Sequence, residues 1–145
     1  MGTYDDLAVG ETFTTPSRAL TNGDLQSLVS IGGYTHPLFT DATFAAASPF
    51  GRRPAPGQAL LLIMGGLVEQ SGRFDRTTIG LVGFESVRFL AAAFAGDTLR
   101  TTVEVLAKEP SSSGRRGVLV MRWRCENGND ETLVEATARM LFRLD

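Results

Sequence analysis

The stretch PAPGQALLLIMGGLVEQSG, residues 54–72, decides how this chain of 145 residues folds. Pro54 and Pro56 end any element that precedes them, and the residues that follow are apolar on every side of a helix. A helix without a polar face is buried all round. Gly65 and Gly66 weaken such a helix, but small residues let a sheet approach it closely. The stretch therefore predicts a central helix held inside a curved sheet.

The sheet is expected downstream of this helix, between residues 77 and 144. Apolar and polar residues alternate there with the period of two that is typical of strands, in runs at 98–106, 118–125 and 134–144. Turn-forming sequences separate these runs and leave no room for crossover helices, so neighbouring strands are expected to be antiparallel. The pattern predicts an α+β fold in which one long antiparallel sheet wraps around the central apolar helix.

The part of the chain before the central helix is less regular. Residues 12–17 predict a short strand, and residues 42–47 predict a short helix that Asp41 caps. Between them, residues 21–24 offer helix-capping side chains ahead of apolar residues at helical spacing, namely Leu25, Leu28, Val29 and Ile31.

The composition is that of a globular domain and argues against several classes of protein. A net charge of −2 argues against a surface that holds phosphate backbones. One histidine and one cysteine, Cys125, argue against a zinc site and a disulfide, and Cys125 is expected in the core. The longest apolar run, residues 59–68, is too short to span a bilayer. We therefore expect a single domain over residues 1–145 in a cytoplasmic protein, without metal, nucleic acid or membrane.

The loop GYTHPLFTD, residues 33–41, holds the only histidine and is the candidate catalytic loop. The ring of His36 can gain and lose a proton near neutral pH, and the hydroxyl of Tyr34 can donate a hydrogen bond. Asp41 is the nearest carboxylate in the loop. Each residue also has a structural interpretation, since His36 can order the turn before Pro37, Tyr34 can pack the loop, and Asp41 can cap the next helix. Both interpretations stay open here.

Three segments in this order resemble motifs of one enzyme family. GYTHPLFTD (33–41) resembles a loop of the form G-D-x-N-P-L-H-x-D, and FGRRPAPGQAL (50–60) resembles F-G-x-x-I-A-H-G-x-L. VRFLAAAFAGDTLRTTVEV (87–105) resembles a segment like R-F-x-x-P-V-x-x-G-D-T-L. The family is the MaoC-like dehydratases, which include the R-specific enoyl-CoA hydratases. The resemblance implies a single hotdog domain over residues 1–145, with the sheet wrapped around the central helix.

The family chemistry explains why such a loop precedes the central helix. Adding water across the double bond of a 2-enoyl thioester needs acid–base groups and a donor for the thioester oxygen. In the family, an Asp and a His of the loop move the protons, and backbone amides at the helix start hold the oxygen. The family Asp falls on Tyr34, its His on Phe39 and its Asn on His36, so the usual pair is replaced. Gly57 matches the family glycine, and its amide is the expected oxyanion donor.

The resemblance also implies how the substrate is held. Phe39 is expected to line the acyl pocket, and Pro56 and Gln58 are expected to contact the substrate at the helix start. The substrate is an acyl thioester of coenzyme A or of acyl carrier protein. Coenzyme A therefore enters as part of the substrate, and no separate cofactor is expected.

Three functions are compatible with these motifs. The first is an acyl-CoA hydratase or dehydratase with a remodelled loop, and the second is a non-catalytic acyl-CoA-binding subunit that pairs with a catalytic MaoC-like partner. The third is a hotdog thioesterase that uses Glu69 as base or nucleophile, although Glu69 lies roughly 18 Å along the helix from Gly57. A long sheet in a short chain leaves an edge exposed, so we also expect a homodimer or a heteromer with a catalytic subunit.

Overall fold

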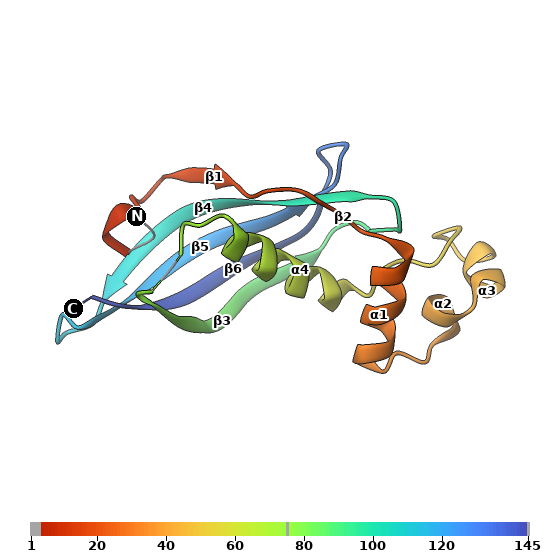
Figure 1. Ribbon diagram of the computed structural model, residues 1–145, viewed down its shortest axis with the longest axis horizontal. Coiled ribbons are helices and arrows are strands. Elements are labelled where there is room, and N and C mark those ends of the chain that lie inside the picture. The colour runs from red at the N-terminus through yellow and green to blue at the C-terminus, as the bar shows by residue number, and fades with distance from the viewer. Residues whose placement is uncertain (1–3, 75, 145) are drawn as a thin grey trace.

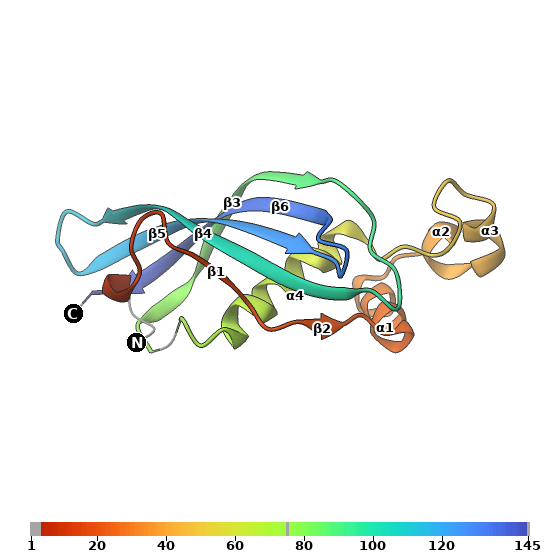
Figure 2. The same cartoon turned by 90° about the horizontal axis from the view of Figure 1, so that it is seen from above.

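The computed structural model describes residues 4–74 and 76–144, so residues 1–3, 75 and 145 of the predicted domain lie outside the described residues. One antiparallel sheet and one long helix on its concave side form the body of the molecule (Figure 1). The shorter α-helices, between residues 22 and 46, gather at one end and project beyond the sheet (Figure 2). The predicted α+β architecture is confirmed.

The sheet runs in the order β1-β4-β5-β6-β3, and β2 also pairs with β4. Its strands are antiparallel. Because β3 comes last in this order, it is an edge strand. The predicted strands after the central helix are confirmed, although the last one ends at Arg143. The strand predicted over residues 12–17 is shorter, because Pro16 has no N–H to donate to a ladder. The bounds are β1 Thr12–Thr14, β2 Arg18–Ala19, β3 Thr78–Phe89, β4 Thr98–Pro110, β5 Arg116–Glu126 and β6 Thr132–Arg143.

The first helix begins at the predicted capping residues. In α1 (Asn22–Gly32), Thr21 Oγ1 accepts a hydrogen bond from the Asp24 amide at 3.0 Å, and the Asp24 carboxylate accepts one from the Thr21 amide at 2.9 Å. This reciprocal capping box satisfies two amides at the helix start. Of the apolar residues at helical spacing, Leu25 and Val29 are buried, whereas the side chain of Ile31 is 87% exposed. The remaining helical elements are η1 Tyr4–Asp6, α2 Pro37–Thr40, α3 Ala42–Ala46 and α4 Gly57–Gln70.

The central helix α4 packs on the concave face formed by β4, β5 and β6. Leu60, Met64 and Leu67 face this sheet and are fully buried. The helix is not buried all round, however, because Leu62 on its other side is 67% exposed. The prediction of a completely enclosed helix is wrong because the sheet covers only one side of it.

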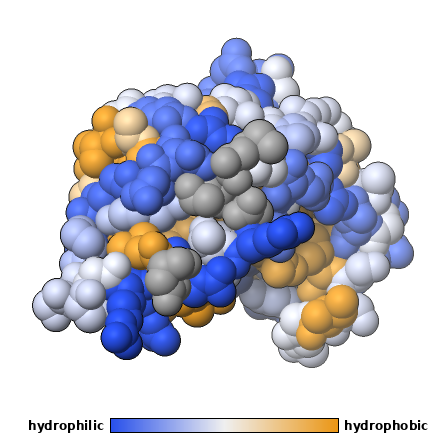
Figure 3. All heavy atoms as spheres, turned by 60° about the vertical axis from the view of Figure 1, so that its left-hand side comes forward, coloured by the Kyte–Doolittle hydropathy of each residue, from blue (hydrophilic) through white to orange (hydrophobic). Residues whose placement is uncertain are grey.

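The two glycines of α4 do not serve a close approach of the sheet. A Cβ atom built on Gly65 or Gly66 would meet no heavy atom within 4 Å. The expectation that they let the sheet approach closely is therefore wrong, since both lie toward the uncovered side of the helix and leave space there. Figure 3 shows orange, hydrophobic patches among hydrophilic atoms on one face of the molecule. The exposed large apolar side chains of the described residues include Leu62, Ile79, Leu81 and Val82.

No helix within the described residues is long and apolar enough to cross a membrane.

The one-sided burial of α4 is tested by truncating leucines on its two sides. We expect Leu67→Ala to lower the free energy of unfolding by about 2–5 kcal/mol, because it leaves a cavity against the sheet. Leu62→Ala removes the same atoms from an exposed position and is expected to change the free energy of unfolding by less than about 0.5 kcal/mol. Urea denaturation of both variants measures this difference, and equal losses would contradict the one-sided packing.

Candidate functional site

Two glycines at the end of α1 determine where the candidate loop begins. Gly33 has a φ of 71°, the left-handed conformation that glycine adopts without strain, and its amide donates to the carbonyls of Ser30 and Val29. A Cβ atom on Gly32 would lie 2.6 Å from the ring of Tyr34. The Tyr34 ring therefore packs back over the helix end, where only glycine leaves room. The sequence shows both glycines, but their effect on Tyr34 was not predicted.

Tyr34 joins the loop to the first turn of α4. Its hydroxyl donates a hydrogen bond to Gln58 Oε1 at 2.9 Å, and its ring meets the Phe39 ring edge-on at a centroid distance of 5.2 Å. Two predicted site residues from distant parts of the sequence are thus in direct contact. Because the contact uses the amide oxygen of Gln58, this side chain has its NH2 group to offer to a ligand.

His36 caps the first short helix of the loop. Its Nδ1 accepts a hydrogen bond from the Leu38 amide at 3.0 Å, and the ring packs edge-on against Phe44 and Phe39. Since Nδ1 is the acceptor, the neutral ring carries its proton on Nε2. His36 therefore orders the turn before Pro37, and its ring can donate from Nε2 while this turn is intact.

Asp41 caps the second short helix. Its Oδ1 accepts hydrogen bonds from the amides of Thr43 at 2.9 Å and Phe44 at 3.2 Å. This is the arrangement that stabilises a helix N-terminus. The carboxylate predicted as a weak catalytic candidate thus has a structural task in this conformation.

An apolar cleft of about 320 Å³ lies beside the first turn of α4, and we call it the helix-start cleft. Of the predicted site residues, Phe39 and Gly57 line this cleft. Gln58 is the next residue after Gly57 and accepts the hydrogen bond from the Tyr34 hydroxyl. Pro56 is the N-cap residue, and no side chain among the described residues caps this helix. The Ala59 amide donates to the Pro56 carbonyl at 3.0 Å, which leaves the amides of Gly57 and Gln58 open to a ligand. Further lining residues are Leu38, Phe50, Pro54, Ala55, Leu60, Phe89, Leu90, Ala91 and Ala92.

Phe89 lies directly against the helix start. A Cβ atom on Gly57 would lie 2.8 Å from the Phe89 ring, so glycine is needed here for close packing. Phe89 and Phe50 are site residues that the sequence reasoning missed. The sequence could have indicated Phe89 as a site residue, because it belongs to one of the three motif segments. Neither the motif nor the spacing predicts its contact with Gly57.

The other candidate side chains lie away from the helix-start cleft. Glu69 is exposed near the far end of α4 and lines a different hollow, between α4 and β3. Cys125 is buried as predicted, and burial together with the Glu126 carboxylate raises the pKa of its thiol to about 12. The thiol is therefore protonated at neutral pH and unreactive. Within residues 4–74 and 76–144, no cluster of three metal-binding side chains is found.

A comparison with known families decides where the chain belongs. The model of the MaoC like domain matches residues 6–121. The chain belongs to the MaoC-like domain family. The MaoC-like resemblance seen in the three motifs is therefore confirmed.

Two relatives of this MaoC-like chain illustrate the family. Beta-methylmalyl-CoA dehydratase of Chloroflexus aurantiacus is 28% identical over 142 residues, which are 97% of this chain and 40% of that protein. The monoamine oxidase regulatory protein of Archaeoglobus has a solved structure that matches with a TM-score of 0.89 and 28% identity, over 99% of this chain and 95% of that one. The MaoC-like chain thus spans less than half of the dehydratase.

A third match concerns the fold alone. A protein of Mycobacterium tuberculosis that is described as having a double hotdog fold matches with a TM-score of 0.77 and 24% identity, over 99% of this chain and 44% of that one. The hotdog fold predicted for this MaoC-like chain is therefore confirmed.

The close contact at the helix start generates a stability prediction. Gly57→Ala is expected to lower the free energy of unfolding by about 1–2 kcal/mol, because the new methyl group displaces the Phe89 ring. The loss should shrink when Phe89→Ala is also present, and urea denaturation of the double-mutant cycle measures this coupling. Gly66→Ala is the matched control in the same helix, since its methyl group meets nothing within 4 Å. A loss at Gly57 that Phe89→Ala does not relieve would show that the ring is not the obstacle.

Proposed function

We propose that this chain is a MaoC-like hydratase or dehydratase that acts on an acyl thioester at the helix-start cleft. One observation carries the proposal, namely that the uncapped first turn of α4 opens next to an apolar cleft. An acyl thioester has the two matching parts, a carbonyl oxygen for the amides and an apolar chain for the cleft. The family resemblance supplies the reaction type, and the acyl group is carried by coenzyme A or by acyl carrier protein.

In this proposal the backbone holds the thioester oxygen. The amides of Gly57 and Gln58 donate to this oxygen, on which negative charge builds as water adds to the double bond. The side-chain NH2 group of Gln58 is a further donor, because Tyr34 engages its oxygen. Tyr34 thereby orients Gln58.

Proton transfer is assigned to His36. Hydration adds the oxygen of water to C3 of the enoyl group and a proton to C2, while the water gives one proton to a base. Phe39, at the position of the family histidine, has no atom that exchanges a proton, and Asp41 is engaged as a helix cap. His36 takes the proton of the water on Nδ1 when this nitrogen releases the Leu38 amide, and its Nε2 gives the proton that C2 receives. The reaction therefore requires the first turn of α2 to open.

Replacing His36 in two ways separates its two tasks. His36→Asn keeps a capping side chain, since asparagine is among the best N-cap residues, but removes the titrating ring. We expect this variant to fold like the native protein while kcat for hydration of 2-enoyl-CoA falls by about 100-fold or more. His36→Ala should lose the cap as well, with about 1 kcal/mol less free energy of unfolding.

Loss of enoyl absorbance measures turnover, and urea denaturation measures stability in the same preparations. If His36→Asn kept the native kcat, His36 would be a cap only, and its role in proton transfer would be wrong.

A second candidate function is favoured by Phe39. Its ring fills the position of the family histidine and packs against Tyr34 in the cleft wall, which suits binding of an acyl chain better than proton transfer. In this case the chain is a non-catalytic acyl-CoA-binding subunit of a heteromer. Three results together would support it. The folded protein would bind acyl-CoA in calorimetry, would lack turnover alone, and would gain turnover with a MaoC-like partner that carries an intact D-x-N-P-L-H loop. The thioesterase alternative has less support, since Glu69 lines another hollow.

We also propose that the chain assembles as a homodimer through β3. Among the described residues this strand pairs with β6 alone, and its other edge is open along Thr78–Phe89. Such an edge pairs readily with another strand, and exposed Ile79, Leu81 and Val82 add apolar surface. The double hotdog fold of the structural neighbour, in a chain more than twice as long, is compatible with this assembly.

Charge placed on this edge should disrupt the dimer. Val82 is 56% exposed and lies near the middle of β3. A two-fold axis that crosses two antiparallel β3 strands near their middle would bring two copies of a new carboxylate near each other. We expect native protein to have the mass of a dimer in light scattering and Val82→Glu to have the mass of a monomer. Val9→Glu, at an equally exposed valine outside the sheet, is the control. A Val82→Glu protein that stays dimeric would exclude this edge as the interface.

A further inference from the structure

Residues 34–50, between the end of α1 and the loop before α4, form a small unit of their own, and we call them the α2–α3 segment. Both of its helices lie beyond the end of the sheet (Figures 1 and 2). α2 and α3 pack chiefly on each other, and the ring of His36 meets those of Phe39 and Phe44 edge-on inside the segment. Ala45 is the one residue of this fully described stretch that is buried, and it is not part of the core between α4 and the sheet.

The hydrogen bonds of the α2–α3 segment also stay within it. The caps at His36 and Asp41 and the turn that follows α3 bind only neighbouring groups. Among the described residues, Tyr34 alone bonds outside the segment, through its amide to the Val29 carbonyl of α1 and through its hydroxyl to Gln58 Oε1. One side-chain hydrogen bond of 2.9 Å therefore holds the segment to α4.

Glycines in the left-handed conformation stand at both ends of the α2–α3 segment. Gly33 has a φ of 71° and Gly51 a φ of 74°, and a Cβ atom on either would meet no heavy atom within 4 Å. Directly after Gly51 the chain is fixed to the body again, since the Arg52 guanidinium lies 4.1 Å over the Phe94 ring. Hinges are a few residues at the ends of a moving element that absorb changes of φ and ψ, and glycine does so at the lowest cost.

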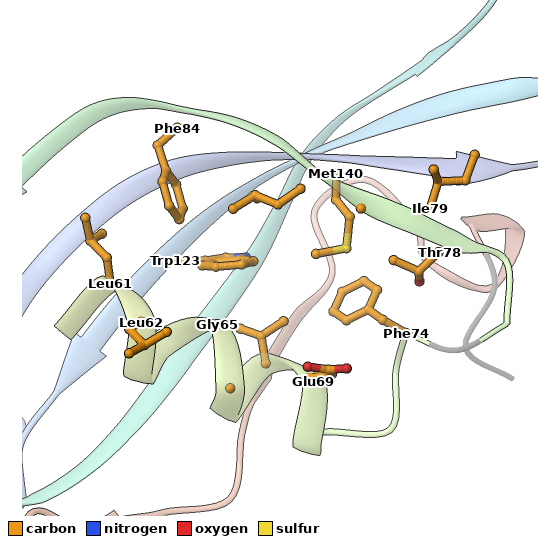
Figure 4. A pocket seen from close by; sticks show the side chains of 14 residues that line it. Leu61, Leu62, Gly65, Glu69, Phe74, Thr78, Ile79, Phe84, Trp123 and Met140 are labelled. Atoms are coloured by element: carbon orange, nitrogen blue, oxygen red, sulfur yellow. The ribbon is translucent and has the colours of Figure 1, made fainter. Parts of the chain in front are cut away.

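The α2–α3 segment supplies one wall of the helix-start cleft. Leu38, Phe39 and Phe50 belong to the segment, and the other lining residues belong to α4, the loop before it, and β3 with the residues that follow. The hollow between α4 and β3 has no such dependence, since its lining in Figure 4 comes from α4, Phe74 and the sheet. A movement of the segment therefore opens the helix-start cleft and leaves the rest of the molecule as it is.

We propose that the α2–α3 segment is a lid that swings on Gly33 and Gly51 and is latched over the helix-start cleft by the hydrogen bond between Tyr34 and Gln58. This inference rests on the proposed function and adds to it the regulation of the same site. When the latch is closed, Tyr34 holds the amide oxygen of Gln58, which fixes the NH2 group as the part that remains for the thioester. When the latch is open, the helix start is accessible to the substrate. The latch thus couples entry of the substrate to the orientation of a donor.

The closed state is held weakly enough for repeated opening. A neutral hydrogen bond changes an equilibrium constant by a factor of only about 2 to 10, because water replaces it when it breaks. The apolar contacts of the lid are limited too, since Leu38 and Phe39 are half-buried and Phe50 is 46% exposed. Lids of this size open on time scales of microseconds to milliseconds, which is compatible with turnover.

Thiol labelling measures the opening of the lid without any substrate. Ala55 is 6% exposed and lines the helix-start cleft on the wall formed by the body, so Ala55→Cys places a small thiol there. The native Cys125 is buried and protonated, and it reacts only when the whole protein unfolds. Dithionitrobenzoate is the reagent, and its rate of reaction with the new thiol follows the open fraction of the lid. Ala92→Cys, on the same wall, repeats the measurement if Ala55→Cys lowers the melting temperature.

Variants of the latch are compared in the Ala55→Cys background. Tyr34→Phe keeps the ring but removes the hydroxyl, and we expect the labelling rate to rise by about three- to tenfold. Tyr4→Phe is the matched control at the other tyrosine, because the Tyr4 hydroxyl is buried without a hydrogen-bond partner among the described residues. Gln58→Ala should label as fast as Tyr34→Phe, and the double variant should label no faster than either.

Gln58→Glu separates the latch from the donor. Its carboxylate still accepts the hydrogen bond of the Tyr34 hydroxyl, but it has no NH2 group to offer. We therefore expect this variant to label no faster than the Ala55→Cys protein, while kcat for hydration of 2-enoyl-CoA falls by at least about tenfold. A merely structural role of Gln58 would change the labelling rate and kcat together.

Two results would overturn the inference. The first is a labelling rate that is the same with and without the Tyr34 hydroxyl, which would show that this hydrogen bond does not hold the lid. The second is reaction of the Ala55→Cys thiol only together with Cys125, which would show that the cleft opens by global unfolding. Both leave the proposed function standing, because neither measurement contains a substrate. Absence of acyl-CoA binding and turnover in folded protein would instead overturn the proposed function, whatever the labelling rates.

Discussion

The packing of α4 on the concave face of the sheet is the interaction on which the rest of the structure depends. Leu60, Met64 and Leu67 are buried against strands β4 to β6, and their burial fixes the axis of the helix. Because the helix begins at Gly57, the same packing fixes where the uncapped amides of its first turn lie. It also leaves the opposite side of the helix uncovered, so one hydrophobic contact produces both the helix-start cleft and the hollow between α4 and β3.

The candidate loop shows how local hydrogen bonding limits chemistry. Helices as short as α2 and α3 have little stability of their own, so their starts depend on capping side chains. His36 and Asp41 supply these caps, which engages the two side chains of the loop that are best suited to proton transfer. Tyr34 is engaged as well, by Gln58. A loop built in this way is ordered for binding, and any acid–base role requires one of these contacts to be released.

Aromatic packing links this loop to the helix start. Phe39 touches Tyr34 and lines the helix-start cleft, and Phe89 covers Gly57 from the other side. The polar groups at the mouth thus border an apolar interior, the combination that most small-molecule sites share.

The sequence by itself determined the elements and their order. The alternation of apolar residues predicted β4 to β6. The prolines before Gly57 predicted the start of α4, and Thr21 with Asp24 predicted the start of α1. These signals are local, since a period or a cap depends on residues within a few positions of one another. Three motifs in their order were likewise enough to place the chain in its family.

Only the tertiary structure decided which side of α4 is covered, what Tyr34 contacts, and why position 57 is glycine. The sequence of a helix that is apolar all round does not indicate which side packs on the sheet. The exposure of Leu62 therefore follows from the length and curvature of β4 to β6. Tyr34 and Gln58 are 24 positions apart, and Gly57 and Phe89 are further apart still. Contacts of this kind depend on how whole elements pack, because side chains distant in sequence meet only after the sheet has closed over the helix.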